Sequence, residues 1–93
     1  MTVKIFIKRD VQDKNFAELT ALLKSLRALT LNQPGYISGE TLQRIDKTNE
    51  SMVISTWRSV GDWNNWVNNP RRLELQTKID QLLGTETDYA VYE

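Results

Sequence analysis

The three tryptophans of the chain, Trp57, Trp63 and Trp66, lie within ten positions of one another. No other segment is so dense in large side chains. Indole rings can form the walls of a pocket that binds a flat, apolar molecule. The same rings could simply fill the core of a small domain, where each buried indole N–H needs a hydrogen-bond partner. The cluster therefore predicts either an aromatic pocket or a packed aromatic core.

Polar residues near the tryptophans are candidates for chemistry. Asp62 lies four positions before Trp66, so both share one face of a helix. A carboxylate held beside indoles can act as a base, but Asp62 also completes the capping box that begins at Ser59. Arg72 could meet an anionic ligand, or the Arg71–Arg72 pair could be solvated. A binding role for Tyr36 depends only on its place after the Pro-Gly turn.

Several classes of chemistry are excluded by residues that the chain lacks. It contains no histidine and no cysteine. The commonest metal ligand, the usual general base and the usual haem ligand are therefore missing, as are disulfides and thiolate chemistry. No phosphate loop, nucleophile elbow, metal-ligand cluster or dinucleotide fingerprint is present. We expect no metal and no cofactor.

The composition predicts a small cytoplasmic protein. The 93 residues allow one domain, residues 1–93, with a marginal core of its own. The 12 basic and 12 acidic side chains balance, which argues against a nucleic-acid partner. No apolar run approaches the ~20 residues that span a bilayer, and the polar N-terminus is unlike a signal peptide. We expect no membrane partner.

Hydrophobic periodicity predicts four strands and a set of helices that position these residues. Alternation indicates strands over 2–9, 36–45, 51–58 and 86–92. Helical spacing indicates a helix capped by Asn15, a second that begins at Val60, and a third that begins at Pro70 and ends at Gly84. Gly39 within the second strand suggests a bulge or a close approach by another group. The first helix carries an apolar stripe that we expect in the core: Phe16, Leu19, Leu22, Leu23, Leu26 and Leu29.

This order of elements predicts an α+β, ferredoxin-like βαββαβ fold. Its four-stranded antiparallel sheet has helices on one face. Val3, Ile5 and Ile7 should face those helices, and Phe6 should lie on the opposite face, with Tyr92 a further candidate there. Because that face would be bare in a monomer, we expect two copies to pack sheet against sheet as a homodimer.

Two stretches, QPGYISGETL and VISTWRSVGDWNNWVNNPRR, resemble the antibiotic biosynthesis monooxygenase (ABM) domain family. The resemblance covers essentially the whole chain and implies a homodimer often described as a dimeric α/β barrel. Characterised members include cofactor-free monooxygenases that use molecular oxygen on polycyclic aromatic substrates, whereas others degrade haem and many have no known activity. Trp66 matches the pocket tryptophan of both active branches, and Asp62 and Arg72 are the nearest candidates for its polar partners.

The resemblance also argues against haem. The haem-degrading branch requires a histidine whose place falls near Gln76, and an asparagine whose place falls at Ile7 or Lys8. Neither residue type is found there, so we expect no haem partner.

We compare three possible functions of the chain. The first is a cofactor-independent monooxygenase acting on a small aromatic quinol or polyketide-like substrate, with Trp66 and Asp62 in catalytic roles and Trp57, Trp63, Tyr36 and Arg72 binding the substrate. The second is a homodimeric ligand-binding or scaffold protein without catalysis. The third is an RNA-recognition module of the same topology, which the run SMVISTWR does not support because it lacks the basic and aromatic signature.

Overall fold

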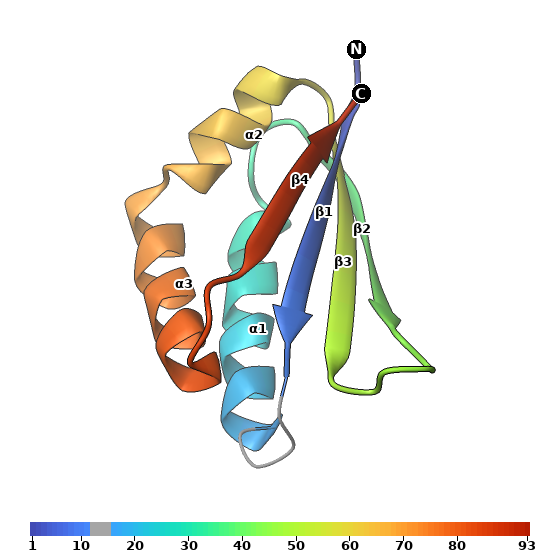
Figure 1. Cartoon of the computed structure of the whole chain (residues 1–93). Coiled ribbons are helices and arrows are strands. Elements are labelled where there is room, and N and C mark those ends of the chain that lie inside the picture. The colour runs from blue at the N-terminus through green and yellow to red at the C-terminus, as the bar shows by residue number, and fades with distance from the viewer. Residues whose placement is uncertain (12–15) are drawn as a thin grey trace.

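The computed structural model describes residues 1–11 and 16–93 and has the predicted order of elements. The sheet has the strand order β2-β3-β1-β4, with antiparallel pairing between all neighbours (Figure 1). All the helices lie on one side of it, which confirms the ferredoxin-like α+β fold. Within one chain the sheet is open and does not close into a barrel. The elements are β1 (Val3–Asp10), α1 (Phe16–Thr30), β2 (Tyr36–Gln43), β3 (Glu50–Trp57), α2 (Val60–Val67), α3 (Pro70–Leu83) and β4 (Asp88–Tyr92).

The element boundaries agree with the predicted ones to within two residues. The second strand ends at Gln43 instead of Ile45, because Arg44 joins the turn through salt bridges to Asp46 and Glu50. The predicted cap at Asn15 lies outside the described residues. Among those that are described, no helix combines the length and apolar character that crossing a bilayer requires.

Both predicted caps in the second half of the chain are present. The Ser59 hydroxyl accepts a hydrogen bond from the Asp62 backbone N–H, and Asn69 accepts from the start of α3. Gly84 ends α3 at a φ of 73°, in the left-handed region that favours glycine. The chain therefore enters and leaves each of these helices at a fixed place.

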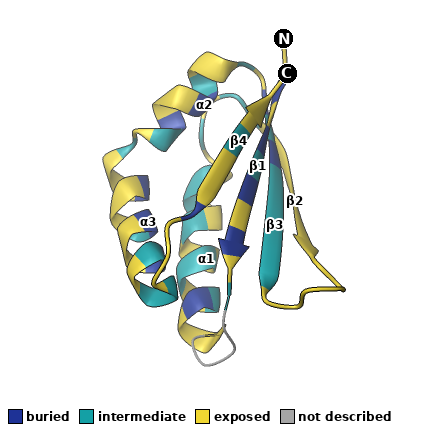
Figure 2. Ribbon diagram, viewed as in Figure 1, coloured by how far each residue is buried: buried dark blue, intermediate teal, exposed yellow. Residues whose placement is uncertain are grey.

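Alternate residues of β1 supply the centre of the core. Val3, Ile5 and Ile7 are buried and form one cluster with the three tryptophans, and Figure 2 shows buried and exposed positions alternating along this strand. This is the face that the period-two pattern predicted. Because β1 pairs with both β3 and β4, its inward side chains lie in the middle of the sheet.

The predicted leucine stripe of α1 is only partly a core element. Leu19 is buried, but Phe16 is 64% exposed, and the remaining leucines of the stripe are half-buried. Leu23 and Leu26 line a cavity between the helix and the sheet. The prediction was wrong for Phe16, because the first turn of α1 leaves it open to solvent.

The face of the sheet opposite the helices is uncovered. Phe6 and Ile54 are cross-strand neighbours on it, and Phe6 meets Tyr92 edge to face with ring centroids 5.0 Å apart. Tyr92 is 58% exposed, and Leu42 and Met52 continue the apolar area toward the β2 edge. The structure of one chain therefore leaves a contiguous apolar strip in solvent.

Helix α3 offers a direct test of the core. Ile79 is fully buried on α3, which packs against α1, whereas Leu73 on the same helix is 46% exposed. We expect Ile79→Ala to lower the free energy of unfolding by about 3 kcal/mol through lost burial and a residual cavity. Leu73→Ala should change it by less than about 0.5 kcal/mol. Urea unfolding followed by circular dichroism measures both, and equal effects would contradict the described packing.

Candidate functional site

A cavity of about 280 Å³ lies between α1 and the helix-facing side of the sheet. This is close to the lower end, roughly 300 Å³, of the range that ligand pockets span. One wall comes from α1 between Thr20 and Thr30, and another from β2 and β3. All three tryptophans of the chain also line it. The volume suits a molecule of one or two fused rings.

Trp57 is the centre of the aromatic wall. Its ring is 5.8 Å from that of Trp63, 5.4 Å from that of Tyr36 and 6.5 Å from that of Trp66 between centroids. The last pair is stacked with an interplanar angle of 24°, and the other two are edge to face. The Trp57 indole N–H donates to the Ser55 hydroxyl at 3.2 Å. These contacts hold the ring at the end of β3 in one orientation.

The short helix α2 places the other two indoles. It begins immediately after β3, and Trp63 and Trp66 lie three positions apart on its buried side. The Trp63 and Trp66 indole N–H groups have no hydrogen-bond partner within the described part of the chain, in contrast to Trp57. The tryptophan pattern of the sequence therefore forms both a core cluster and a cavity wall.

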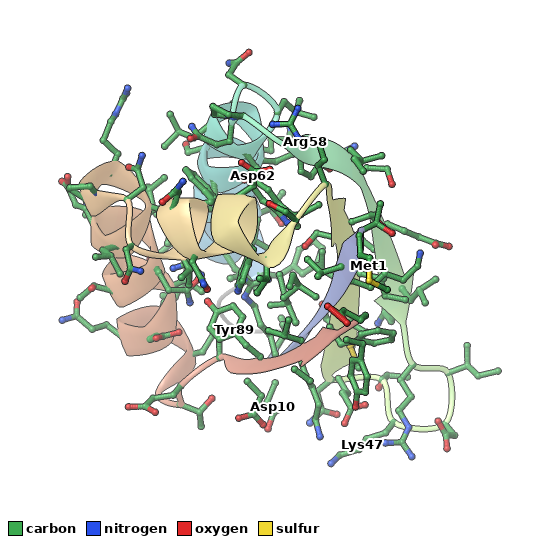
Figure 3. The ribbon with its side chains drawn as sticks, turned by 90° about the horizontal axis from the view of Figure 1, so that it is seen from above. Met1, Asp10, Lys47, Arg58, Asp62 and Tyr89 are labelled. Carbon is green, nitrogen blue, oxygen red and sulfur yellow. The ribbon has the colours of Figure 1, made fainter. Side chains whose placement is uncertain are left out.

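Asp62 does not line the cavity. Its carboxylate accepts hydrogen bonds from the Ser59 hydroxyl at 3.0 Å and from the Arg58 guanidinium at 3.4 Å, and Figure 3 shows Asp62 beside Arg58 at the start of α2. The capping-box geometry directs the carboxylate back toward the helix start, away from the side on which Trp66 is buried. A catalytic role for Asp62 stays a prediction, and the geometry favours capping.

Asp62 also explains the glycine of the Pro-Gly turn. Gly35 has a φ of 83°, and a side chain there would overlap the Asp62 carboxylate. The Gly35 carbonyl accepts a hydrogen bond from the Arg58 backbone N–H at 2.7 Å. The Pro-Gly turn therefore contacts both the end of β3 and the cap of α2, and the lack of a side chain at Gly35 makes this packing possible.

Tyr36 lines the cavity at the start of β2, where its ring packs on Trp57. A register shift between Tyr36 and Ser38 turns this part of the strand, and a Cβ at Gly39 would lie 2.5 Å from the Tyr36 hydroxyl. Of the two alternatives predicted for Gly39, the close approach by another group is confirmed, whereas the irregularity of the strand lies before Gly39, between Tyr36 and Ser38. The glycine leaves room for the tyrosine hydroxyl beside the strand.

Arg72 is buried, whereas Arg71 is exposed, so the idea of a solvated pair holds only for Arg71. The Arg72 guanidinium lies 5.8 Å from the Trp63 ring centroid and 5.3 Å from that of Tyr89. It donates hydrogen bonds to the Val67 carbonyl at 3.3 Å and to the Tyr89 hydroxyl. In Figure 3, Tyr89 lies on the helix side of β4. Cation–π contacts and hydrogen bonds together fix this cation at the cavity wall.

Arg9 is a cavity residue that the sequence analysis missed. It is 5% exposed and donates to the Gln76 side-chain oxygen at 3.4 Å, while its Nε has no partner among the described residues. Burial lowers the pKa of Arg9 from its usual value, and the nearby Arg72 charge lowers that pKa further, while Tyr89 and Asp80 act to raise it. Arg9 follows Val3, Ile5 and Ile7 at period two, so the alternation itself could have placed it inward.

Gln76, near which the resemblance places the histidine of the haem-degrading branch, belongs to a buried polar network. Its amide N–H donates to the Asp80 carboxylate at 2.7 Å and to the Thr87 hydroxyl at 2.8 Å, while its oxygen accepts from Arg9. The described residues contain no group of three or more His, Cys, Asp or Glu side chains placed to hold a metal. Glu40 is the one acidic residue among the described residues that line the cavity. The site can therefore offer aromatic walls and arginine donors to a ligand.

The sequence matches the family model for antibiotic biosynthesis monooxygenase over residues 2–78. A search of curated proteins found no match. The comparison with solved structures found many similar chains, which share the fold at low sequence identity.

Three of these structures show the extent of the likeness. A conserved protein from Methanosarcina mazei Go1 has a TM-score of 0.90 at 20% identity, covering 100% of this chain and 92% of that one. SnoaB, a cofactor-independent oxygenase from Streptomyces nogalater, has a TM-score of 0.85 at 20% identity, covering 99% and 91%. Rv0793 from Mycobacterium tuberculosis has a TM-score of 0.86 at 18% identity, covering 100% and 94%.

The contact between Tyr36 and Gly39 predicts a double-mutant cycle. Gly39→Ala alone should cost about 1–2 kcal/mol of stability, because the new methyl group meets the tyrosine hydroxyl. In a Tyr36→Phe background the same change should be neutral or stabilising, since the hydroxyl is gone and alanine has less freedom to lose on folding. Urea unfolding of the four proteins gives the coupling energy. Additive effects of the two substitutions would show that the hydroxyl does not occupy this place.

Proposed function

Given that the chain belongs to the antibiotic biosynthesis monooxygenase family, we propose that it is a cofactor-independent monooxygenase acting on a small, electron-rich aromatic substrate of the quinol or anthrol kind. The observation that carries the proposal is the cavity walled by Trp57, Trp63 and Trp66 between α1 and the sheet. Its volume and its aromatic walls suit a flat ring system.

The reaction needs no external reductant with such a substrate. In an anthrol-type oxygenation the substrate loses one hydrogen from the reacting carbon and one from its hydroxyl group. The carbon gains one oxygen atom of O2, and the second oxygen atom leaves with those two hydrogens as water. The substrate supplies all four electrons that reduce O2. The protein's part is to hold the ring, to favour its ionised and therefore more easily oxidised form, and to keep water away from the reactive intermediates.

Trp66 is the residue that we place in contact with the reacting molecule. It lines the cavity and is almost fully buried, and its indole N–H has no partner within the described part of the chain. That donor could bind an oxygen of the substrate or of reduced O2, where developing negative charge strengthens a hydrogen bond. Trp57 and Trp63 then act as walls, and Tyr36 closes the end near the Pro-Gly turn.

A homodimeric ligand-binding protein without catalysis is the second candidate. It is favoured by one observation, which is that the predicted base Asp62 lies outside the cavity. Proton removal from the substrate would then depend on solvent or on a favourable electrostatic field. Oxygen consumption separates the two candidates.

Oxygen uptake with a panel of hydroquinones tests the monooxygenase. We expect uptake above the buffer rate, and a decrease of about tenfold or more in Trp66→Phe, which keeps a ring but loses a hydrogen bond of about 1.4 kcal/mol. Leu73→Ala, on the exposed side of α3, is the control and should keep the full rate. No uptake above buffer with any member of the panel would favour the binding protein. Full activity in Trp66→Phe would remove Trp66 from the reaction.

We also propose that two copies pack through the uncovered sheet face. The strip formed by Phe6, Ile54, Tyr92, Leu42 and Met52 is apolar and in solvent in the single chain. Two such faces related by a two-fold axis would bury it on both sides. The α/β barrel of the family would then be a property of the pair.

Light scattering tests this assembly. We expect a mass of twice the 10.8 kDa of one chain at micromolar concentration. Phe6→Lys should give a monomer, because it adds a third positive charge between Lys4 and Lys8 on the packed face. Ile45→Lys, at an exposed position beyond the end of β2, is the control and should stay dimeric. A monomeric parent protein, or a dimeric Phe6→Lys variant, would contradict the proposed interface.

A further inference from the structure

We propose that Arg9 and Arg72 form an anion-binding subsite within the cavity, and that the aromatic ligand carries an acidic oxygen group, either a carboxylate or an ionised phenol. This inference rests on the proposed function only in taking this cavity as the ligand site. It adds to the proposed aromatic ligand the negatively charged oxygen group by which the cavity would hold it.

The burial of Arg9 without an anionic partner is the main evidence for the subsite. Its side chain is 95% removed from solvent, since 5% is exposed, yet it forms no ion pair among the described residues. Its one protein partner is the neutral oxygen of Gln76 at 3.4 Å, and its Nε is buried with no acceptor at all. A buried cation without an anion is costly for a folded chain. The Nε of Arg9 is sealed, but its Nη1 has no acceptor among the described residues and is not enclosed in the same way, so Arg9 can donate to a group that the protein does not contain.

Arg72 adds a second buried cation to the same cavity. Its side chain is 3% exposed and is held against the rings of Trp63 and Tyr89. Its protein acceptors are a carbonyl and a hydroxyl, and no carboxylate among the described residues pairs with it. The guanidinium is therefore fixed in place before any ligand arrives, which reduces the entropy cost of binding.

Asp80 is an acidic residue near Arg9, but the two side chains do not form a salt bridge. Asp80 accepts hydrogen bonds from Gln76 and Thr87, and its hydrogen-bonded link to Arg9 runs through the Gln76 amide, while its charge also acts to raise the pKa of Arg9. Neither Arg9 nor Arg72 forms a salt bridge with a described carboxylate, which leaves two buried positive charges at this part of the cavity. Burial lowers the pKa of Arg9, and the positive charge of Arg72 acts in the same direction.

The rest of the cavity lining continues the charge excess. Among the described lining residues, Lys24 and Arg27 on α1 add two further basic groups, and Glu40 is the single acidic one. The chain as a whole carries equal numbers of acidic and basic side chains. A neutral protein that gathers basic groups around one apolar cavity favours an anionic aromatic ligand over a neutral one.

Guanidinium groups recognise planar oxygen anions through paired hydrogen bonds, and tryptophan walls recognise the attached ring. A cavity of about 280 Å³ can hold one or two fused rings with one such group. An ionised phenol in this place would also answer the missing base, because two nearby cations stabilise the oxyanion of the substrate. Carboxylate and phenolate share this chemistry, and the two are separated by the choice of probe.

Calorimetric titration with matched aromatic pairs tests the inference. The first pair is 2-naphthoate and its neutral isostere 2-naphthamide, and the second is 4-nitrophenolate at mildly alkaline pH and nitrobenzene. We expect the protein to bind at least one anion about tenfold or more tightly than its neutral partner. A preference in the first pair alone indicates a carboxylate ligand, and a preference in the second alone indicates a phenolate.

Arg9→Met is the decisive variant. It keeps the length of the side chain and removes the charge, so the anion preference should fall to near unity while the neutral probes bind as before. Its thermal midpoint should be equal to or above that of the parent, because an unpaired buried cation has been removed. Arg71→Met removes the same charge from an exposed position beside Arg72 and should keep the full preference. Arg72→Lys keeps the charge without the planar fork and should lose most of it.

Three results would overturn the inference. Equal binding of the anion and its neutral partner in both pairs is one, binding of none of the four probes is another, and an unchanged preference in Arg9→Met is the third. These results are independent of oxygen uptake. An anion preference without oxygen consumption would support the subsite and end the monooxygenase proposal, whereas oxygen consumption without an anion preference would do the reverse.

Discussion

The packing of Trp57 against its aromatic neighbours is the contact on which the rest of the structure depends. The ring ends β3 and touches the first residue of β2, Tyr36, as well as both indoles of α2. It therefore joins the start of β2, which is distant in the sequence, to the end of β3 and to the α2 helix that follows. Because its indole N–H is satisfied by Ser55, the ring can be fully buried without the cost of an unpaired donor.

The cavity is a consequence of this arrangement. The tryptophans fill the space beneath α2, so α2 packs closely on the end of the sheet, while the leucines of α1 only partly cover β2 and β3. Small residues of β3 that line the cavity, Ser51 and Ser55, leave this space open. A domain of this size is only marginally stable, and an unfilled cavity lowers its free energy of unfolding further. A ligand that binds in the cavity would stabilise the folded state.

The charged residues around the cavity determine which kind of ligand it favours. Arg9 and Arg72 are held inside by an amide, two aromatic rings and a carbonyl, and none of these neutralises a charge. Asp62 and Arg58, by contrast, pair with one another at the helix start, where they serve the local structure. The two kinds of ion environment lie within one small chain, and only the unpaired kind is suited to a ligand.

Local patterns determined most of the fold. Period-two alternation placed Val3, Ile5 and Ile7 on the core face, and the capping box fixed the start of α2. Both patterns can be seen in the sequence because they involve residues a few positions apart. The order of strands and helices along the chain then selected the sheet topology. The tertiary structure decided which side chains from distant segments meet: that Arg72 is buried beside Tyr89 whereas Arg71 is exposed, and that Arg9 meets Gln76 from 67 positions away. These facts depend on how α3 lies beside β1 and β4, which brings side chains together from distant segments, and no local spacing encodes that arrangement.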